Sequence, residues 1–387
     1  MNRDRQTTEN FLKALEHIEY GAMTITTPDG ARHVYQGTKP GAHADVTLHD
    51  WRMVGRMLRD GDIGIAETYR DGWWSAVKVE DFLEAGLQNE AALKRYIFGG
   101  SLGRLKARLL YLLRHNTLRG SRRNIFAHYD LGNAFYQLWL DPSMTYSSAL
   151  FASPSATLHE AQQHKYDRIL DRLGARSGRL LEIGCGWGGF AARALERADL
   201  AIKGITISKA QHDYAAARLG GRADIALEDY RQIEGKYDHL VSIEMFEAVG
   251  ERFWPVYFQK VAALLEKKGK AVIQTITIAD QHFEEYRKGG DAIRSFVFPG
   301  GMLPSPSRFQ AEAAKAGLKT TDRHAFGQDY AKTLEHWLMR FEEKRSEIMA
   351  LGFDEPFCRI WRYYLAACIA SFKVGRTDVM QWELQHG

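Results

Sequence analysis

The chain is poor in cysteine, has no long apolar run and carries little net charge. Its three cysteines form no CxxC pair, which excludes a disulfide framework and a paired-cysteine metal site. No stretch reaches the roughly 18 apolar residues that a membrane span needs, so any contact with a bilayer is expected to be peripheral. The net charge of +4 is too small to indicate nucleic acid as the partner of the whole chain. The scarcity of cysteine fits a reducing compartment, and we expect a cytoplasmic location.

One segment departs from the even distribution of charge. Between Glu90 and Asp130 there is no acidic residue, while basic residues alternate with leucine and aromatic side chains. Such a stretch suits anionic lipid headgroups, where each cation contributes about 1 kcal/mol, although most charge runs are simply solvated helix faces. No helix-turn-helix, zinc or base-stacking motif accompanies the charge, which disfavours nucleic acid. The basic residues are Lys94, Arg95, Arg104, Lys106, Arg108, Arg114, Arg119, Arg122 and Arg123.

The part of the chain after about residue 155 alternates strand-like and helical runs. The strand-like runs are RLLEIGC, AIKGITI, DHLVSIE and GKAVIQTITI, and the helical runs between them are FAARALERA, KAQHDYAAARL and PVYFQKVAALL. This order predicts a βαβ series, and therefore an α/β fold with a parallel sheet and right-handed crossovers. With 387 residues and 45% apolar content, the chain is long enough for a second unit, and the elements before residue 93 carry no catalytic signature.

A glycine-rich run follows the first of these strands and opens a helix. It begins at Glu182 and places Gly184, Gly186 and Gly188 in the spacing G-x-G-x-G. These glycines let the backbone turn and approach a ligand closely. The carboxylate of Glu182 would repel the pyrophosphate of a dinucleotide, but it offsets the positive sulfonium and ammonium groups of S-adenosylmethionine. The run therefore predicts a site for this methyl donor.

The next strands are expected to supply ribose and adenine contacts at their C-terminal ends. The second strand ends without an acidic residue, so hydroxyl and amide groups would have to bind the ribose. The third leads into a turn whose carboxylate can accept from the adenine amine and whose aromatic ring can stack, although an ordinary solvated loop is the alternative. The candidates are Thr206, Ser208, Gln211, Asp229, Tyr230 and Arg231.

Five segments occur together in a characteristic order: HYDLGNAFYQLWLDPSMTYSSALF at 128–151, EIGCGWGG at 182–189, GITISKAQ at 204–211, MFEAVG at 245–250 and FPGGMLPS at 298–305. Together they resemble the cyclopropane-fatty-acyl-phospholipid synthase family, which includes the mycolic acid cyclopropane synthases. The resemblance implies a Rossmann-like class I methyltransferase fold at 121–387, with a mostly parallel seven-stranded sheet flanked by helices. A looser likeness implies a smaller α+β, lipid-associating domain with the basic arm at 1–120. It also adds Tyr146 and Ser147 to the donor contacts.

The resemblance further implies the reaction and its base. Family members transfer the methyl group to a cis double bond of an unsaturated phospholipid acyl chain, giving a cyclopropane ring, and cradle a bicarbonate base with Cys, Glu, His and Tyr. In this chain the Glu position is Glu247 and the Tyr position is Tyr330. The Cys position is Ser148 and the His position is Gln274. A neutral amide cannot share a proton as imidazole does, which puts bicarbonate in doubt. Cys368 matches a cysteine sometimes considered catalytic, but its apolar helical stripe fits a core position equally well.

Three functions remain open from the sequence. The first is a lipid C-methyltransferase that forms a cyclopropane or, if the proton is lost elsewhere, a methyl- or methylene-branched chain. The second is a small-molecule N-methyltransferase, since some plant alkaloid enzymes look like this family, and the third is a lipid-binding module without catalysis. The expected partners are an unsaturated phospholipid and the anionic inner face of the membrane, with no metal and no nucleic acid. A homodimer is a candidate assembly, and the acyl length, double-bond position and head group stay open.

Overall fold

The computed structural model describes residues 3–100 and 131–387 of the chain. Its contacts divide the chain into two compact units. Unit 1 consists of Met1–Leu113, Glu285–Pro299 and Phe341–Arg376, and unit 2 of Arg114–Glu284, Gly300–Arg340 and Thr377–Gly387. The division at residue 120 therefore stays a prediction, while the contacts place two later segments with the N-terminal part. Most of the basic stretch from Lys94 to Arg123 lies outside the described residues.

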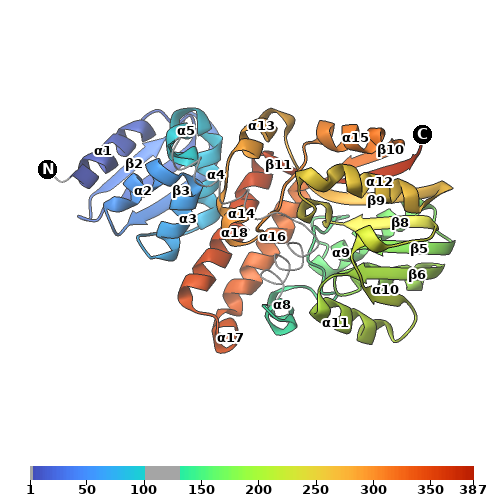
Figure 1. The fold of residues 1–387 in the computed structure, drawn as a ribbon. Helices are drawn as coiled ribbons and strands as arrows, with labels where there is room; N and C mark the ends of the chain where they lie inside the picture. The colour runs from blue at the N-terminus through green and yellow to red at the C-terminus, as the bar shows by residue number, and fades with distance from the viewer. Residues whose placement is uncertain (1–2, 101–130) are drawn as a thin grey trace. The chain divides into compact units, whose positions relative to one another are not determined.

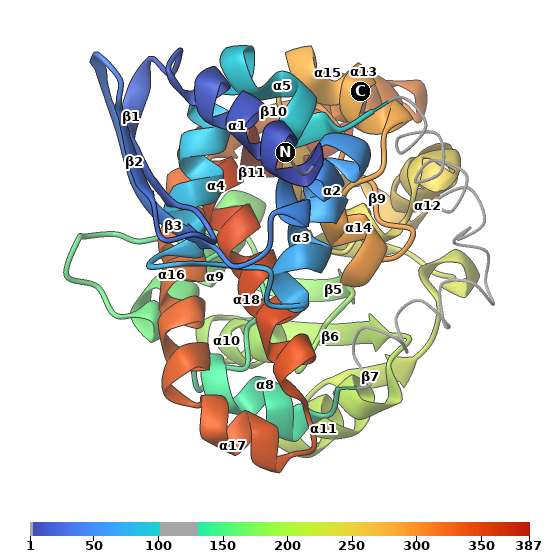
Figure 2. The same cartoon turned by 90° about the vertical axis from the view of Figure 1, so that its left-hand side faces the viewer.

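Unit 1 is built on a four-stranded sheet in the order β2-β1-β3-β4. Strand β1 pairs antiparallel with β2 and parallel with β3, and β3 pairs antiparallel with β4. Helix α4 packs against β1 and β3 (Figure 2). The strands are β1 (Tyr20–Thr26), β2 (Arg32–Gln36), β3 (Lys39–Leu48) and β4 (Trp74–Ala76). The helices within it are α1 (Arg3–Leu15), α2 (Arg52–Asp60), α3 (Asp62–Arg70), α4 (Val79–Gln88), α5 (Glu90–Phe98), α14 (Ala292–Phe296), α17 (Arg345–Ala350) and α18 (Glu355–Lys373).

Helix α18 explains why a late segment belongs to unit 1. It packs against α3 and α4, and its buried side chains, among them Trp361, Leu365 and Ile369, recur at helical spacing. Arg359 of this helix donates from Nη2 to the carbonyl oxygen of Trp74 at 3.0 Å. The apolar stripe that the sequence shows in this helix is therefore a packing surface within unit 1.

Unit 2 is an α/β unit around a seven-stranded sheet in the order β10-β11-β9-β8-β5-β6-β7 (Figure 1). The five strands from β9 to β7 in this order run parallel, and β11 pairs antiparallel with both β9 and β10. This confirms the predicted Rossmann-like class. The strands are β5 (Ser177–Ile183), β6 (Asp199–Thr206), β7 (Asp224–Leu227), β8 (Tyr237–Ile243), β9 (Leu265–Ile278), β10 (Leu318–Ala325) and β11 (Thr377–His386).

The helices of unit 2 follow the crossovers that the sequence predicts. Helix α9 begins with a capping box, in which Thr157 and Glu160 satisfy each other's backbone N–H groups. The α-helices are α8 (Asn133–Trp139), α9 (Leu158–Leu173), α10 (Gly189–Arg197), α11 (Lys209–Leu219), α12 (Trp254–Leu264) and α15 (Pro306–Lys315), and the short 3₁₀ turns are η1 (Tyr230–Gln232), η2 (Phe246–Ala248) and η3 (Glu251–Phe253). Two more, α13 (Asp280–Lys288) and α16 (Gly327–Glu343), cross the boundary between the units.

The strand order reverses at β5, with β6 and β7 on one side and β8 and β9 on the other. Open α/β sheets bind ligands in the crevice beyond the carboxyl ends of the strands at such a point. We therefore expect a ligand site at the loops after β5, β6 and β8. Across residues 3–100 and 131–387, no helix combines the length and the apolar character that crossing a membrane requires.

Candidate active site

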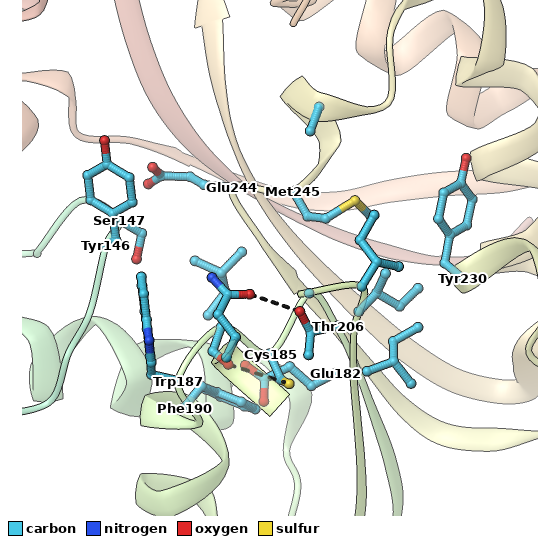
Figure 3. A pocket seen from close by; sticks show the side chains of 18 of the residues that line it. Tyr146, Ser147, Glu182, Cys185, Trp187, Phe190, Thr206, Tyr230, Glu244 and Met245 are labelled. Carbon is cyan, nitrogen blue, oxygen red and sulfur yellow. Dashed lines mark hydrogen bonds between the residues drawn. The ribbon is translucent and has the colours of Figure 1, made fainter. Parts of the chain in front are cut away.

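A pocket opens where β5, β6 and β8 end, as the strand order requires (Figure 3). The loop after β5, the segments that follow β6, β7 and β8, and residues 144–147 form its wall. Gly188 and Ser208 are not among the lining residues, because Gly188 faces α11 and Ser208 caps it. The other predicted donor-binding residues all line the pocket: Tyr146, Ser147, Glu182, Gly184, Gly186, Thr206, Gln211, Asp229, Tyr230 and Arg231.

The three glycines of the loop after β5 all have a backbone that only glycine adopts easily. Their φ angles are +83° at Gly184, +51° at Gly186 and +79° at Gly188. A Cβ at Gly184 would lie 2.9 Å from Cγ of Met245, whereas one at Gly186 would meet no protein atom within 4 Å. Gly186 therefore borders open space in the pocket, so a ligand can approach its backbone directly.

The Glu182 carboxyl group lies in the wall of the pocket. The side chain is buried, and its Oε2 accepts no hydrogen bond from the described residues. Burial raises the pKa of Glu182 well above its usual value, and Lys165 opposes this shift. An unpartnered buried carboxylate oxygen is costly unless a ligand compensates it. A cationic sulfonium ligand fits this requirement, and the residues present therefore fit S-adenosylmethionine.

A buried lysine holds the segment before α9 against the pocket. Lys165 is fully buried and donates from Nζ to Oγ of Ser147 at 2.7 Å. Gln162, one turn earlier on α9, donates from Nε2 to the carbonyl oxygen of Ser147 at 2.9 Å. Burial lowers the pKa of Lys165 to about 7, although the nearby carboxylates, Glu244 foremost, favour its charged form. These contacts fix Ser147 and its neighbour Tyr146 in the wall.

Several of the residues predicted to bind the ribose and adenine form hydrogen bonds with one another. Thr206 donates from Oγ1 to Oε1 of Gln211 at 2.8 Å. The Asp229 carboxylate accepts from Nε and Nη2 of Arg231 at 2.8 and 2.7 Å, so an adenine amine would share it with the guanidinium. Tyr230 is nearly buried, and its ring meets Tyr257 edge-on at a centroid distance of 5.5 Å. The acidic-aromatic turn is thus an ordered part of the wall and not a solvated loop.

Glu244 is the residue that sequence analysis missed. It directly follows β8, lines the pocket, and its side chain extends toward Tyr146 and Ser147 (Figure 3). Its Oε1 accepts from the backbone N–H of Ser148 and from Nε2 of Gln274, both at 2.8 Å. Its Oε2 accepts from the Tyr330 hydroxyl at 2.6 Å. The signal in the sequence was its position at the end of the strand DHLVSIE, where α/β folds place functional groups.

Glu247, the residue predicted at this place, lies in η2 and not in the pocket wall. Its Oε1 accepts from the backbone N–H of Ile276, and its buried Oε2 accepts no hydrogen bond from the described residues. Burial and then the charge of Glu244 raise the pKa of Glu247 to about 8. At neutral pH Glu247 is therefore mainly protonated.

The structure brings three of the predicted catalytic residues together, but around a different carboxylate. Ser148, Gln274 and Tyr330 all donate to Glu244, and Ser148 does so with its backbone, since its hydroxyl donates to the carbonyl oxygen of Ala149 at 2.9 Å. Cys368 belongs to unit 1, on α18, and is not a lining residue of the pocket. Burial raises the pKa of its thiol, which disfavours the thiolate.

Comparisons with known proteins show the family to which the chain belongs. A family model described as mycolic acid cyclopropane synthetase matches residues 116–382. The tuberculostearic acid methyltransferase UfaA1 of Mycobacterium tuberculosis is 38% identical over 354 residues, which cover 85% of this chain and 80% of that protein. The cyclopropane-fatty-acyl-phospholipid synthase of Escherichia coli is 34% identical over 354 residues, covering 89% and 87%. A solved structure of the mycolic acid cyclopropane synthase CmaA1 with SAH and CTAB covers 68% of this chain and 98% of its own, with TM-score 0.64 and 33% identity.

Proposed function

Because the chain belongs to the mycolic acid cyclopropane synthetase family, and so is an S-adenosylmethionine-dependent methyltransferase that acts on lipids, we propose that it methylates a cis double bond in a phospholipid acyl chain. The product that we propose first is a cyclopropane ring. The names of the relatives support an acyl substrate, since one is called a fatty-acyl-phospholipid synthase and another a tuberculostearic acid methyltransferase.

The observation that carries this proposal is a pair of carboxyl groups in one pocket, of which Glu182 is buried and Glu244 is partly buried. Glu182 has an unpartnered oxygen that suits a cationic methyl donor, and Glu244 is a second, separately held acceptor. Methylation of an alkene requires both, since a positive charge first sits on the donor and then on the acyl chain. Apolar and aromatic side chains, including Trp187, Phe190 and Met245, line the rest of the pocket and exclude water from a reactive cation.

The proposed reaction has two steps, transfer of the methyl group to the double bond and then loss of a proton. The π electrons of the double bond form a bond to the methyl carbon, and the carbon–sulfur bond breaks with its electron pair left on sulfur. The other alkene carbon then carries the positive charge. A base removes one proton from the new methyl group, and the electrons of that C–H bond close the three-membered ring. The role of the protein is to orient the chain, exclude water and accept the proton.

A methyl- or methylene-branched product is the second candidate, and a specific observation favours it. Gln274 and Ser148 stand where the resemblance led us to expect histidine and cysteine, and their donors are directed at Glu244. A base in a different position can remove the proton from a different carbon of the methylated cation, or at a later stage. If a hydride shift precedes deprotonation, or if a chain carbon loses the proton, a branched alkene forms and no ring closes. The 38% identity to a tuberculostearic acid methyltransferase is in keeping with this alternative.

Labelled methyl donor and vesicles of an unsaturated phospholipid test the proposal. We expect label in the acyl chains, and none when the vesicles contain the matched saturated phospholipid. Proton NMR of the purified product distinguishes cyclopropane protons, which lie upfield of the methyl signals, from branched alkene protons. Incorporation into saturated lipid, or into the head group, would contradict the proposed substrate.

We also propose that the protein works at the anionic inner face of the cytoplasmic membrane. The support is the acid-free stretch of the sequence that contains Arg104, Lys106 and Arg108. A variant with these three residues changed to glutamate should float poorly with anionic vesicles. Binding by the parent should weaken as the screening length shortens from about 10 Å at 0.1 M salt to about 3 Å at 1 M. Equal flotation of both proteins at low salt would rule out this stretch as the membrane contact.

A further inference from the structure

Glu244 occupies the place where the resemblance predicts a bound anion. Three donors from separate parts of unit 2 converge on its carboxylate: the backbone of Ser148, the Gln274 amide on β9 and the Tyr330 hydroxyl on α16. The distances of 2.6–2.8 Å are those of good charge-assisted hydrogen bonds. A carboxylate of the chain itself therefore holds the donors that a separate anion would need.

Bicarbonate does not fit this arrangement. Each of the three donors already has an acceptor, and a second negative charge beside Glu244 would be repelled in a buried environment. We propose, on the basis of the proposed function, that the Glu244 carboxylate is itself the proton acceptor of the reaction. The C–H bond of the methylated cation breaks, its electrons remain with the acyl chain, and the proton forms an O–H bond on Glu244.

The hydrogen bonds leave Glu244 able to accept a proton. An ionised carboxylate offers about four acceptor positions, and three are used here. Oε1 takes two donors and Oε2 takes only one, so Oε2 is the oxygen with capacity to spare. Burial raises the pKa of Glu244 above its usual value, while its three donors oppose that shift. The raised pKa makes the ionised form of this group a stronger base than a carboxylate in water.

The backbone conformation of Glu244 favours a functional role over a purely structural one. Within the described residues, only Glu244 and Met144 combine a side chain with a positive φ, at +50° and +55°. Both line the same pocket. A non-glycine residue in this conformation costs on the order of 1 kcal/mol, and such strain concentrates at active sites. The strained turn directs the Glu244 side chain toward its three donors.

Two variants of Glu244 distinguish a catalytic base from a residue that only holds its three hydrogen-bond donors in place. Glu244→Gln keeps the size of the side chain but removes the basic oxygen, and Glu244→Ala opens the space between the three donors. Glu312→Gln is the matched control, because Glu312 is a carboxylate of unit 2 that is buried but does not line the pocket. Each protein is assayed for methyl transfer to unsaturated phospholipid vesicles in carbon dioxide-free buffer, with and without added bicarbonate or formate, and for SAH binding by calorimetry.

We expect the parent to turn over equally well without bicarbonate. Glu244→Gln should lose at least about 100-fold in turnover while its SAH affinity stays within about threefold, since general-base catalysis contributes about that much. Glu244→Ala should lose as much and recover in part with formate or bicarbonate, which can sit between the vacated donors, whereas Glu244→Gln should not recover. Near-parent turnover of Glu244→Gln, or a parent that needs bicarbonate, would overturn the inference.

Anion binding tests the inference separately from the phospholipid assignment. Carbon-13 NMR with labelled formate and labelled bicarbonate should show binding to Glu244→Ala and none to the parent at this site. This readout needs no lipid, so it stands even if the parent fails to methylate any unsaturated phospholipid, which would count against the proposed function alone. Labelled bicarbonate that binds the parent as well as Glu244→Ala would contradict the occupied site.

Discussion

Replacing Gly186 with valine should abolish donor binding without unfolding unit 2. A Cβ at this position meets no protein atom within 4 Å, so the new side chain enters the open pocket and not the core. The folding cost comes from the φ of +51°, which for a residue with a side chain amounts to about 1–2 kcal/mol. This lowers the melting temperature by only a few degrees in a chain of this size.

The loss of binding should be much larger than the loss of stability. The three added carbon atoms of the valine side chain, in space that the ligand needs, should weaken SAH affinity by at least about 100-fold, or about 2.7 kcal/mol. Gly220→Val is the control, because Gly220 also has a positive φ of +56°, meets nothing within 4 Å and does not line the pocket. Calorimetry with SAH and thermal melting of both variants give the two readouts. Unchanged affinity in a folded Gly186→Val protein would refute the placement of the donor.

Three further outcomes follow from the charges of the site. Glu182→Gln should weaken binding of S-adenosylmethionine more than binding of SAH, because only the former carries the sulfonium charge; equal losses by calorimetry would contradict this. Tyr330→Phe removes a donor that favours ionised Glu244, so the pKa of Glu244 should rise and the acidic limb of the turnover profile should move to higher pH; an unmoved limb would count against the contact. Between the usual pKa of 4.5 and about 8, folded Glu247 holds a proton that the unfolded chain has released, so its contribution to the free energy of unfolding falls as pH rises through this window, by about 1.4 kcal/mol per pH unit at most. Glu247→Gln cannot ionise and should flatten this slope in urea unfolding between about pH 5 and about pH 8, whereas an identical slope would show that Glu247 is ionised in the folded state.

Local patterns were enough to predict most of the residues that line the pocket. The apolar strand before Glu182, the glycines after it and the helix that follows are contiguous, so the sequence alone indicates a turn that a ligand can approach. The same holds for Tyr230, whose place after β7 follows from the order of elements. The pairing of Asp229 with Arg231 depends on the conformation of the turn η1, and the sequence does not specify that conformation.

The hydrogen bonds around Glu244 could not be predicted in this way. Glu244 accepts hydrogen bonds from Gln274 on the next strand and Tyr330 on α16, which lie 30 and 86 residues away. The resemblance led us to Glu247, three positions later. A sequence motif matches residue types, but it does not show which carboxylate accepts the hydrogen bonds of Ser148, Gln274 and Tyr330. The grouping of α18 with unit 1 likewise depends on contacts with α3 and α4 that are distant in sequence.

The most direct test of the central claim is mass spectrometry of phospholipid treated with the protein and a donor whose methyl group is fully deuterated. We predict that the added carbon is found in the unsaturated acyl chain and retains two of its three deuterium atoms, because the transferred methyl group loses one deuteron to Glu244. Label that is absent from the acyl chain would contradict methyl transfer to the double bond. A chain that retains all three deuterium atoms would contradict removal of the proton from that methyl group.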